Sequence, residues 1–112
     1  MCGICGTVDP TGKIESSELK KMSDIMRHSG PDAEGVWVSA DHVFGLGHRR
    51  LSIIDLDPRS NQPFVSDDGN VILSFNGEIY NFLDVKHLLE AKGHKFRTQS
   101  DTEMMIHAYQ EW

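Results

Sequence analysis

The sequence of 112 residues lacks the features that mark several large classes of protein. Its two cysteines are too few for the disulfide framework of a small secreted domain. No apolar run exceeds the length of a strand, so none could cross a bilayer as a helix. No basic segment followed by an apolar one marks a secretory signal. Positive charge is also scarce: 11 Lys and Arg against 17 Asp and Glu give a net charge of -6. Nucleic acid and an anionic membrane are therefore poor partners for this chain.

The composition that remains is that of an ordinary globular domain. Hydrophobic residues make up 38% of the chain and charged residues 25%, which is typical of folded soluble proteins. A chain of this length can form one domain with a modest core. The sequence contains no internal repeat, low-complexity tract or linker. We expect one domain over residues 1–112, and a cytoplasmic location by default.

Apolar periodicity and turn residues predict short strands interspersed with three helices. The helices are expected from Ser16 or Ser17 to about Arg27, over Phe82–Lys92, and from Ser100 into Trp112. Because the strands follow one another in hairpins and do not alternate with helices, an α+β fold with antiparallel sheets is predicted. Strands are predicted at Gly3–Val8, Gly35–Val38, Val43–Leu46, Leu51–Ile54, Phe64–Ser66 and Val71–Phe75, the last two flanking the hairpin signal Asp67-Asp68-Gly69-Asn70.

The expected helices carry recognisable caps and apolar faces. Ser100 and Glu103 have the spacing of a capping box, in which each side chain satisfies the other's free backbone amide. Asn81 is the expected cap of the second helix, and Gly93 its stop. The residues expected to face inward are Leu19, Met22, Ile25 and Met26 in the first helix, and Val85, Leu88 and Leu89 in the second.

Cys2 is the residue that most directly suggests chemistry. If Met1 is removed, Cys2 carries both a thiol and a free α-amine. The thiolate is the nucleophilic form. An α-amine titrates at about 7.7–8.0, so it could accept the thiol proton near neutral pH. If Met1 is retained, the nitrogen of Cys2 is an amide and this chemistry is lost. The alternative is that Cys2 is an ordinary second residue without a role.

Cys2 and Cys5 also form a C-x-x-C pair, which suggests a redox dithiol or half of a zinc site. No two of the six histidines have the spacing of zinc ligands, and the cysteine segment is predicted as a strand, whereas redox pairs begin helices. Strand alternation places Cys5 on the face opposite Cys2, as a small buried residue. We therefore expect no metal site.

Asn76 and Gly77 allow two interpretations. Both residues are common in turns before a helix. Alternatively, an Asn amide and a Gly backbone N–H could form an oxyanion hole, and the loss of one of these two donors would reduce a rate on the order of 10²–10³-fold.

Two charged positions are equally ambiguous. Arg49 and Arg50 precede a predicted strand and could be solvated surface, or one of them could bind a carboxylate through two parallel hydrogen bonds. Asp101 could simply complement the dipole of a helix N-terminus, or it could bind an ammonium group.

Taken together in chain order, these segments resemble the class II glutamine amidotransferases. The resemblance is nearest to the glutaminase domain of glutamine-dependent asparagine synthetases and covers essentially the whole chain. It is carried by Met1–Ile4, Arg27–Asp32, Arg50–Asp55, Gln62–Pro63, Asn76–Asn81 and Ser100–Asp101.

The resemblance implies an N-terminal-nucleophile hydrolase fold, an αββα sandwich of two antiparallel sheets between helical layers. It implies that Cys2 attacks the side-chain amide of L-glutamine, while Asn76 and the Gly77 amide hold the oxyanion. Arg50 would bind the α-carboxylate of glutamine, and Asp101 with Glu78 nearby its α-ammonium group. The remaining residues expected to line the substrate pocket are Leu51, Ser52, Ile53 and Ile54.

The sequence departs from the family pattern in two respects. Ser29 stands where the family usually has arginine. The larger departure is length, because family glutaminase domains continue past the third helix with further strands and are followed by a synthetase domain. No glycine-rich phosphate loop of such a domain is present. We therefore expect residues 1–112 to be the N-terminal part of a glutamine amidotransferase domain, an incomplete sandwich without its own cofactor. ATP and Mg²⁺ are expected only in a synthetase domain outside this chain, which would be the partner, with oligomerisation also expected to be possible. Alternatives are a non-catalytic remnant, or delivery of ammonia to a different acceptor.

Overall fold

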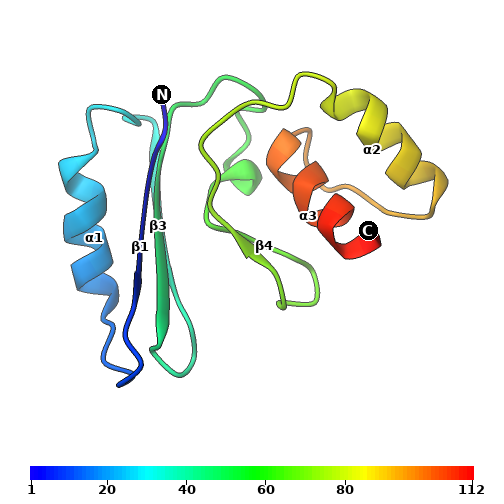
Figure 1. The fold of residues 1–112 in the computed structure, drawn as a ribbon. Coiled ribbons are helices and arrows are strands. Elements are labelled where there is room, and N and C mark those ends of the chain that lie inside the picture. Colours follow the sequence, from blue (N-terminus) through cyan, green and yellow to red (C-terminus); the bar gives the residue numbers. More distant parts are fainter.

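The computed structural model describes residues 1–112 and confirms an α+β architecture with two antiparallel sheets. A three-stranded sheet has the order β1-β3-β2, and a two-stranded sheet pairs β4 with β5. Figure 1 shows α1 on one side of the first sheet, and α2 and α3 beyond the second. The elements are β1 (Gly3–Val8), α1 (Ser16–Ile25), β2 (Ala33–Val38), β3 (Phe44–Arg50), the 3-10 turn η1 (Pro58–Ser60), β4 (Phe64–Val65), β5 (Ile72–Leu73), α2 (Phe82–Ala91) and α3 (Asp101–Glu111).

The close packing of α1 on the first sheet depends on glycine. A Cβ added at Gly45 of β3 would lie 2.6 Å from Cδ1 of Leu19, which is completely buried. The apolar face predicted for this helix is only partly right. Leu19 and Ser23 are buried, whereas Met22 and Ile25 are exposed. The helix contacts the sheet along a narrow i, i+4 stripe, so these two side chains lie beyond its edges.

The predicted helix caps are also partly wrong. Glu15, without a side-chain cap bond, precedes α1, and Ser16 is already helical. Asn81 does precede α2 but makes no side-chain cap bond, and Leu88 is exposed. Gly93 ends α2 with a φ of 98°, as expected for a left-handed C-terminal residue.

The capping box of α3 forms only on one side. The hydroxyl of Ser100 accepts a hydrogen bond from the Glu103 N–H at 3.2 Å. The Glu103 carboxylate accepts from the backbone nitrogens of Arg97 and Thr98, and the Ser100 N–H donates to the Thr98 hydroxyl. Glu103 therefore orders the loop that leads into the helix.

The strand predicted at Leu51–Ile54 does not form. The backbone carbonyls of Ile54 and Asp55 both accept hydrogen bonds from the Arg50 guanidinium, which turns the chain back at the end of β3. Asp55 has a left-handed backbone with a φ of 51°. The predicted hairpin between β4 and β5 is confirmed, with Gly69 at a φ of 75°, although both strands are shorter than predicted.

Antiparallel pairing brings the start of the chain next to the end of β3. Gly3 pairs with Arg49, so Cys2 reaches the segment that follows Arg50. No helix has both the length and the apolar character needed to cross a membrane.

Candidate functional site

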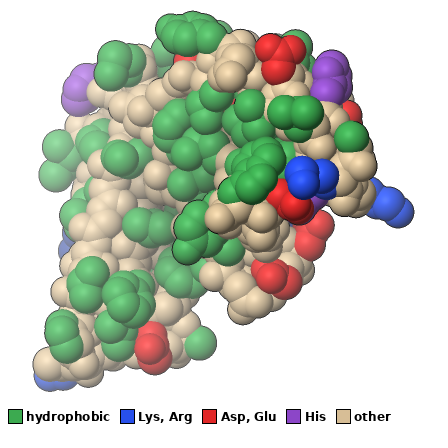
Figure 2. All heavy atoms as spheres, turned by 45° about the vertical axis from the view of Figure 1, so that its right-hand side comes forward, with side chains coloured by type: hydrophobic (Ala, Val, Ile, Leu, Met, Phe, Trp, Pro, Cys, Tyr) green, Lys and Arg blue, Asp and Glu red, His purple; other side chains and the backbone are tan.

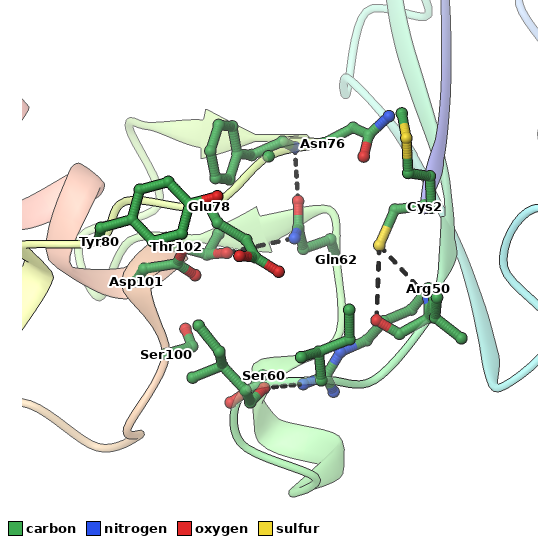
Figure 3. A pocket seen from close by; sticks show the side chains of 16 residues that line it. Cys2, Arg50, Ser60, Gln62, Asn76, Glu78, Tyr80, Ser100, Asp101 and Thr102 are labelled. Carbon is green, nitrogen blue, oxygen red and sulfur yellow. Dashed lines mark hydrogen bonds between the residues drawn. The ribbon is translucent and has the colours of Figure 1, made fainter.

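A cavity of about 350 Å³ lies where the start of β1 and the end of β3 approach the start of α3 (Figure 3). Every site residue predicted from the sequence lines this cavity except Ser52. The backbone N–H of Ser52 instead donates to Oδ2 of Asp32 at 2.8 Å. The lining residues are Met1, Cys2, Arg50, Leu51, Ile53, Ile54, Ser60, Gln62, Phe75, Asn76, Gly77, Glu78, Tyr80, Ser100, Asp101 and Thr102.

Cys2 is held at the edge of the cavity by the backbone of Leu51. Its sulfur accepts a hydrogen bond from the Leu51 N–H at 3.3 Å and donates to the Leu51 carbonyl at 3.6 Å. The thiol is therefore fixed by the segment that carries Ile53 and Ile54, two further cavity residues.

Cys5 lies in a different environment. Its sulfur packs over Gly47, where an added Cβ would approach it to 2.6 Å. Burial raises the pKa of the Cys5 thiol, and a backbone hydrogen bond involving Gly47 opposes this only in part. Both cysteines are free, and Cys5 does not line the cavity. This arrangement does not fit a dithiol pair.

Asn76 and Gly77 follow a segment that is held by side chains. The Phe75 N–H donates to Oε1 of Gln62 at 2.5 Å, and Nε2 of His48 donates to the Phe75 carbonyl at 3.0 Å. The Asn76 side chain is exposed and makes no hydrogen bond within the chain. Figure 3 shows its amide on the same side of the cavity as Cys2. The amide is therefore free to bind a group near the thiol.

Arg50 is buried, with only 6% of its surface exposed, so the surface interpretation of this residue is wrong. Its Nη1 donates to the Asp57 carbonyl at 3.2 Å and to Oδ1 of Asn61 at 2.8 Å. Its Nη2 donates to the carbonyls of Ile54 and Asp55. These bonds occupy four of the five N–H groups of a guanidinium and leave Nε–H without a partner. The carboxylate-binding role stays a prediction, and Nε–H is the donor that remains for it.

Asp101 and Glu78 supply negative charge to the cavity from the side opposite Cys2 (Figure 3). Asp101 is the first residue of α3 and is 6% exposed. One of its oxygens, Oδ2, accepts a hydrogen bond from the Ile79 N–H at 3.1 Å. The other oxygen has no partner in the chain, so it can accept a bond from a cationic ligand.

Asp55 connects the two loops that flank the cavity. Its carboxylate accepts hydrogen bonds from the Gln99 N–H at 2.6 Å, the Asp57 N–H at 3.0 Å and the Ser60 hydroxyl at 2.8 Å. Partial burial acts to raise the pKa of the Asp55 carboxyl, but these three donors outweigh it and lower the pKa. The Arg50 loop and the loop before Asp101 are thereby tied together.

Several cavity residues are absent from the sequence-based prediction. Four of them, Met1, Gln62, Tyr80 and Ser100, had a signal, because they lie in segments that carry the family resemblance. The other three, Ser60, Phe75 and Thr102, lie outside those segments, and no sequence pattern places their side chains in a site.

Comparisons with known proteins give a consistent result. The model of a family described as a glutamine amidotransferase domain matches residues 1–112. Asparagine synthetase [glutamine-hydrolyzing] 1 of Bacillus subtilis is 40% identical over 116 residues, and that of Arabidopsis thaliana is 36% identical over 115. Amidase chry2 of Gibberella zeae is 40% identical over 123 residues. Each match covers 100% of this chain but only 18% or 19% of the relative, so the chain spans about a fifth of their length.

Proposed function

The chain belongs to the glutamine amidotransferase domain family, and we propose that it releases ammonia from L-glutamine with Cys2 as the nucleophile. The observation that carries the proposal is the convergence of Cys2, Asn76 and Asp101 on one cavity. These residues come from three separate parts of the chain, and they supply a thiol, an amide donor and a carboxylate. An amino acid with a side-chain amide needs this combination.

The fold that we propose is the N-terminal-nucleophile hydrolase sandwich. It is supported by the order of the layers and by the position of Cys2 directly before β1. Once Met1 is removed, Cys2 becomes the first residue of the chain, directly before β1 and at the cavity.

The proposed reaction requires removal of Met1, which gives Cys2 a free α-amine. The amine takes the thiol proton, and the sulfur attacks the side-chain carbonyl carbon of glutamine. The C=O electron pair moves to oxygen, and that oxyanion accepts hydrogen bonds from the Asn76 amide and the Gly77 N–H. The C–N bond then breaks, the ammonium group of Cys2 returns its proton, and ammonia leaves. Water hydrolyses the glutamyl thioester to glutamate and the free thiol.

The α-ammonium and α-carboxylate groups of glutamine need partners of opposite charge. Asp101, with one free carboxylate oxygen, is proposed to bind the α-ammonium group, assisted by Glu78. Arg50 is proposed to bind the α-carboxylate through Nε–H. The Leu51–Ile54 segment would cover the aliphatic part of the glutamine side chain. Ser52 does not line the cavity, and it would support this segment through the hydrogen bond of its N–H to Asp32.

In the whole protein we propose that the ammonia serves ATP-dependent synthesis of asparagine from aspartate. The support is that relatives named as glutamine-hydrolysing asparagine synthetases match the entire chain. ATP and Mg²⁺ would then bind to a synthetase domain, which these 112 residues do not include. A different ammonia acceptor is the second candidate. It is favoured by the relative named as an amidase, which is also 40% identical.

Release of glutamate and ammonia from glutamine tests the proposal, measured on the chain with Met1 removed. Wild type is expected to form the two products in equal amounts, Cys2→Ala to form neither, and Cys5→Ala to behave as wild type. Cys5→Ala is the matched control because Cys5 lies outside the cavity. A folded wild-type chain that forms no product would favour the non-catalytic alternative. Equal activity in Cys2→Ala would contradict the role of the thiol.

A further inference from the structure

The residue before the proposed oxyanion donors is held by side chains and not by a sheet. β5 ends at Leu73, two residues before Phe75. Oε1 of Gln62 accepts the Phe75 N–H at 2.5 Å, and Nε2 of His48 donates to the Phe75 carbonyl at 3.0 Å. Gln62 is 8% exposed and His48 is fully buried. The path of the backbone into Asn76 therefore depends on two buried side chains.

The other end of the Gln62 amide reaches α3. Its Nε2 donates to Oγ1 of Thr102 at 3.2 Å, and Thr102 is 3% exposed. Thr102 directly follows Asp101, the proposed ammonium-binding residue. Figure 3 shows Gln62 in the middle of the cavity wall, with one hydrogen bond directed up towards the segment of Asn76 and the other to the left, towards Thr102.

We infer that Gln62 is a positioning residue that sets the spacing between the oxyanion donors and the ammonium-binding carboxylate. One planar amide bonds the residue before Asn76 and the residue after Asp101 at the same time. Glutamine must be bound at its α-ammonium group while its side-chain carbonyl oxygen accepts a hydrogen bond from Asn76. A fixed spacing between these two points therefore sets which length of substrate can react. This inference rests on the proposed function.

The bridge uses both ends of the primary amide. The Phe75 N–H needs an acceptor and the Thr102 oxygen receives a donor, and the Gln62 amide supplies both on one terminal group. A buried N–H without an acceptor is costly, so the backbone would move to find another partner. A displacement of about 1 Å at reacting groups can reduce a rate by about 10²-fold.

His48 supports the same segment from the first sheet. Burial lowers the pKa of His48, and the positive charge of Arg50 acts in the same direction, against the hydrogen bond to Phe75. The ring is therefore neutral near pH 7, with its single proton on Nε2, where it faces the Phe75 carbonyl. Both polar groups of the Phe75 backbone thus keep their partners across the neutral pH range.

The test compares wild type with Gln62→Met, Gln62→Glu and the control Gln110→Met in the chain with Met1 removed. Gln110 is exposed and lies on α3, and its side chain makes one hydrogen bond, from Nε2 to Oδ1 of Asp68. In Gln62→Met, which keeps side-chain length without polar groups, we expect hydrogen exchange at the Phe75 N–H to be at least tenfold faster. NMR shifts should change at Asn76, Gly77 and Asp101, and kcat for glutamine should fall about 10- to 100-fold.

Gln62→Glu tests the same bridge by conservative replacement. One carboxylate oxygen can accept the Phe75 N–H and the other the Thr102 hydroxyl proton, so we expect protection of Phe75 to be retained and kcat to lie within about fivefold of wild type. If Gln62→Met fails to fold, the protection of the Phe75 N–H in Gln62→Glu still tests the positioning role of Gln62. Gln110→Met should match wild type throughout.

Unchanged Phe75 exchange in a folded Gln62→Met, or loss of its protection in Gln62→Glu, would overturn the positioning role. An equal acceleration of hydrogen exchange at all amides of Gln62→Met would also overturn the positioning role, because it would indicate general destabilisation of the fold. The exchange and shift measurements need no turnover. A wild-type chain without glutaminase activity would therefore refute the proposed function, while these measurements still decide the role of Gln62.

Discussion

The sulfur of Cys2 lies 3.3 Å from the backbone nitrogen of Leu51, a residue 49 positions away in the chain. The contact follows from the antiparallel pairing of Gly3 with Arg49, which places the start of the chain beside the end of β3. The pairing of β1 with β3 therefore positions both the Cys2 thiol and the Leu51–Ile54 segment of the cavity wall.

Asn76→Ala is expected to lower kcat for glutamine on the order of 10²–10³-fold, with little change in KM. The reason is that the amide binds the oxyanion of the transition state more strongly than the substrate carbonyl. Steady-state kinetics check this. Asn81→Ala is the matched control, because Asn81 ends the same segment and makes no side-chain cap bond. An unchanged kcat with a raised KM would refute the role of Asn76.

Arg50→Lys is expected to raise KM for glutamine and to lower the thermal unfolding temperature. A lysine cannot donate to all four loop acceptors that Arg50 reaches, and each buried acceptor left unpaired costs about 1–3 kcal/mol. Thermal unfolding and kinetics on the same samples measure both effects. The exposed residue Arg59, which does not line the cavity, provides the control Arg59→Lys, which should leave KM for glutamine unchanged. If Arg50→Lys leaves both quantities unchanged, Arg50 holds neither loop nor ligand.

Gly45→Ala is expected to destabilise the fold by about 1–3 kcal/mol, because the new methyl group would meet Leu19 at 2.6 Å and push α1 away from the sheet. Denaturant unfolding measures the change. Gly6→Ala on β1 is the comparison, since its Cβ would come no closer than 3.2 Å to the end of the Leu46 side chain and 3.3 Å to the Gly45 carbonyl oxygen. Equal stability of the two variants would mean that α1 does not rest on Gly45.

Asp57 gives a prediction about acid pH. Its carboxylate accepts hydrogen bonds from the Arg59 side chain and from the Arg59 N–H, and these lower its pKa from 3.8 to about 2. A lowered pKa in the folded state means that the contribution to stability is complete above about pH 4. That contribution is lost as the pH falls from there towards 2. A carbon-detected NMR titration should place the Asp57 midpoint near 2, and Arg59→Ala should move it back towards 3.8. A midpoint already near 3.8 in wild type would contradict the contact.

The sequence predicts well where local signals and long-range contacts agree. β1 is found at the predicted residues Gly3–Val8, and the hairpin at Gly69 forms as its turn residues require. The Leu51–Ile54 strand was predicted wrongly, because β-branched residues favour a strand locally while the Arg50 guanidinium turns the backbone away. Helical periodicity predicts Met22 and Ile25 on the inward face, but both are exposed, because periodicity gives the direction of an apolar face and not its width.

In the candidate site, too, some residues could be predicted from the sequence and others could not. Cys2, Asn76, Gly77 and Asp101 could be named from motifs in chain order, and all four line the cavity. The multiple bonds of Arg50 to the following loop could not be predicted, since they depend on a turn that has no sequence signature. The bridging role inferred for Gln62 needs three segments distant in the chain, and only the structure shows that they meet.

The central claim is that Cys2 is a nucleophile in a glutamine-shaped pocket, and intact mass spectrometry tests it most directly. The chain with Met1 removed is incubated with a glutamine analogue that carries an electrophilic group in place of the side-chain amide. We predict a single adduct that maps to Cys2, is prevented by excess glutamine, persists in Cys5→Ala and is absent from Cys2→Ala. Burial of the Cys5 thiol, which raises its pKa, makes Cys2 the selective target. A folded chain with Met1 removed that forms no adduct at Cys2, or one that glutamine does not prevent, would contradict the claim.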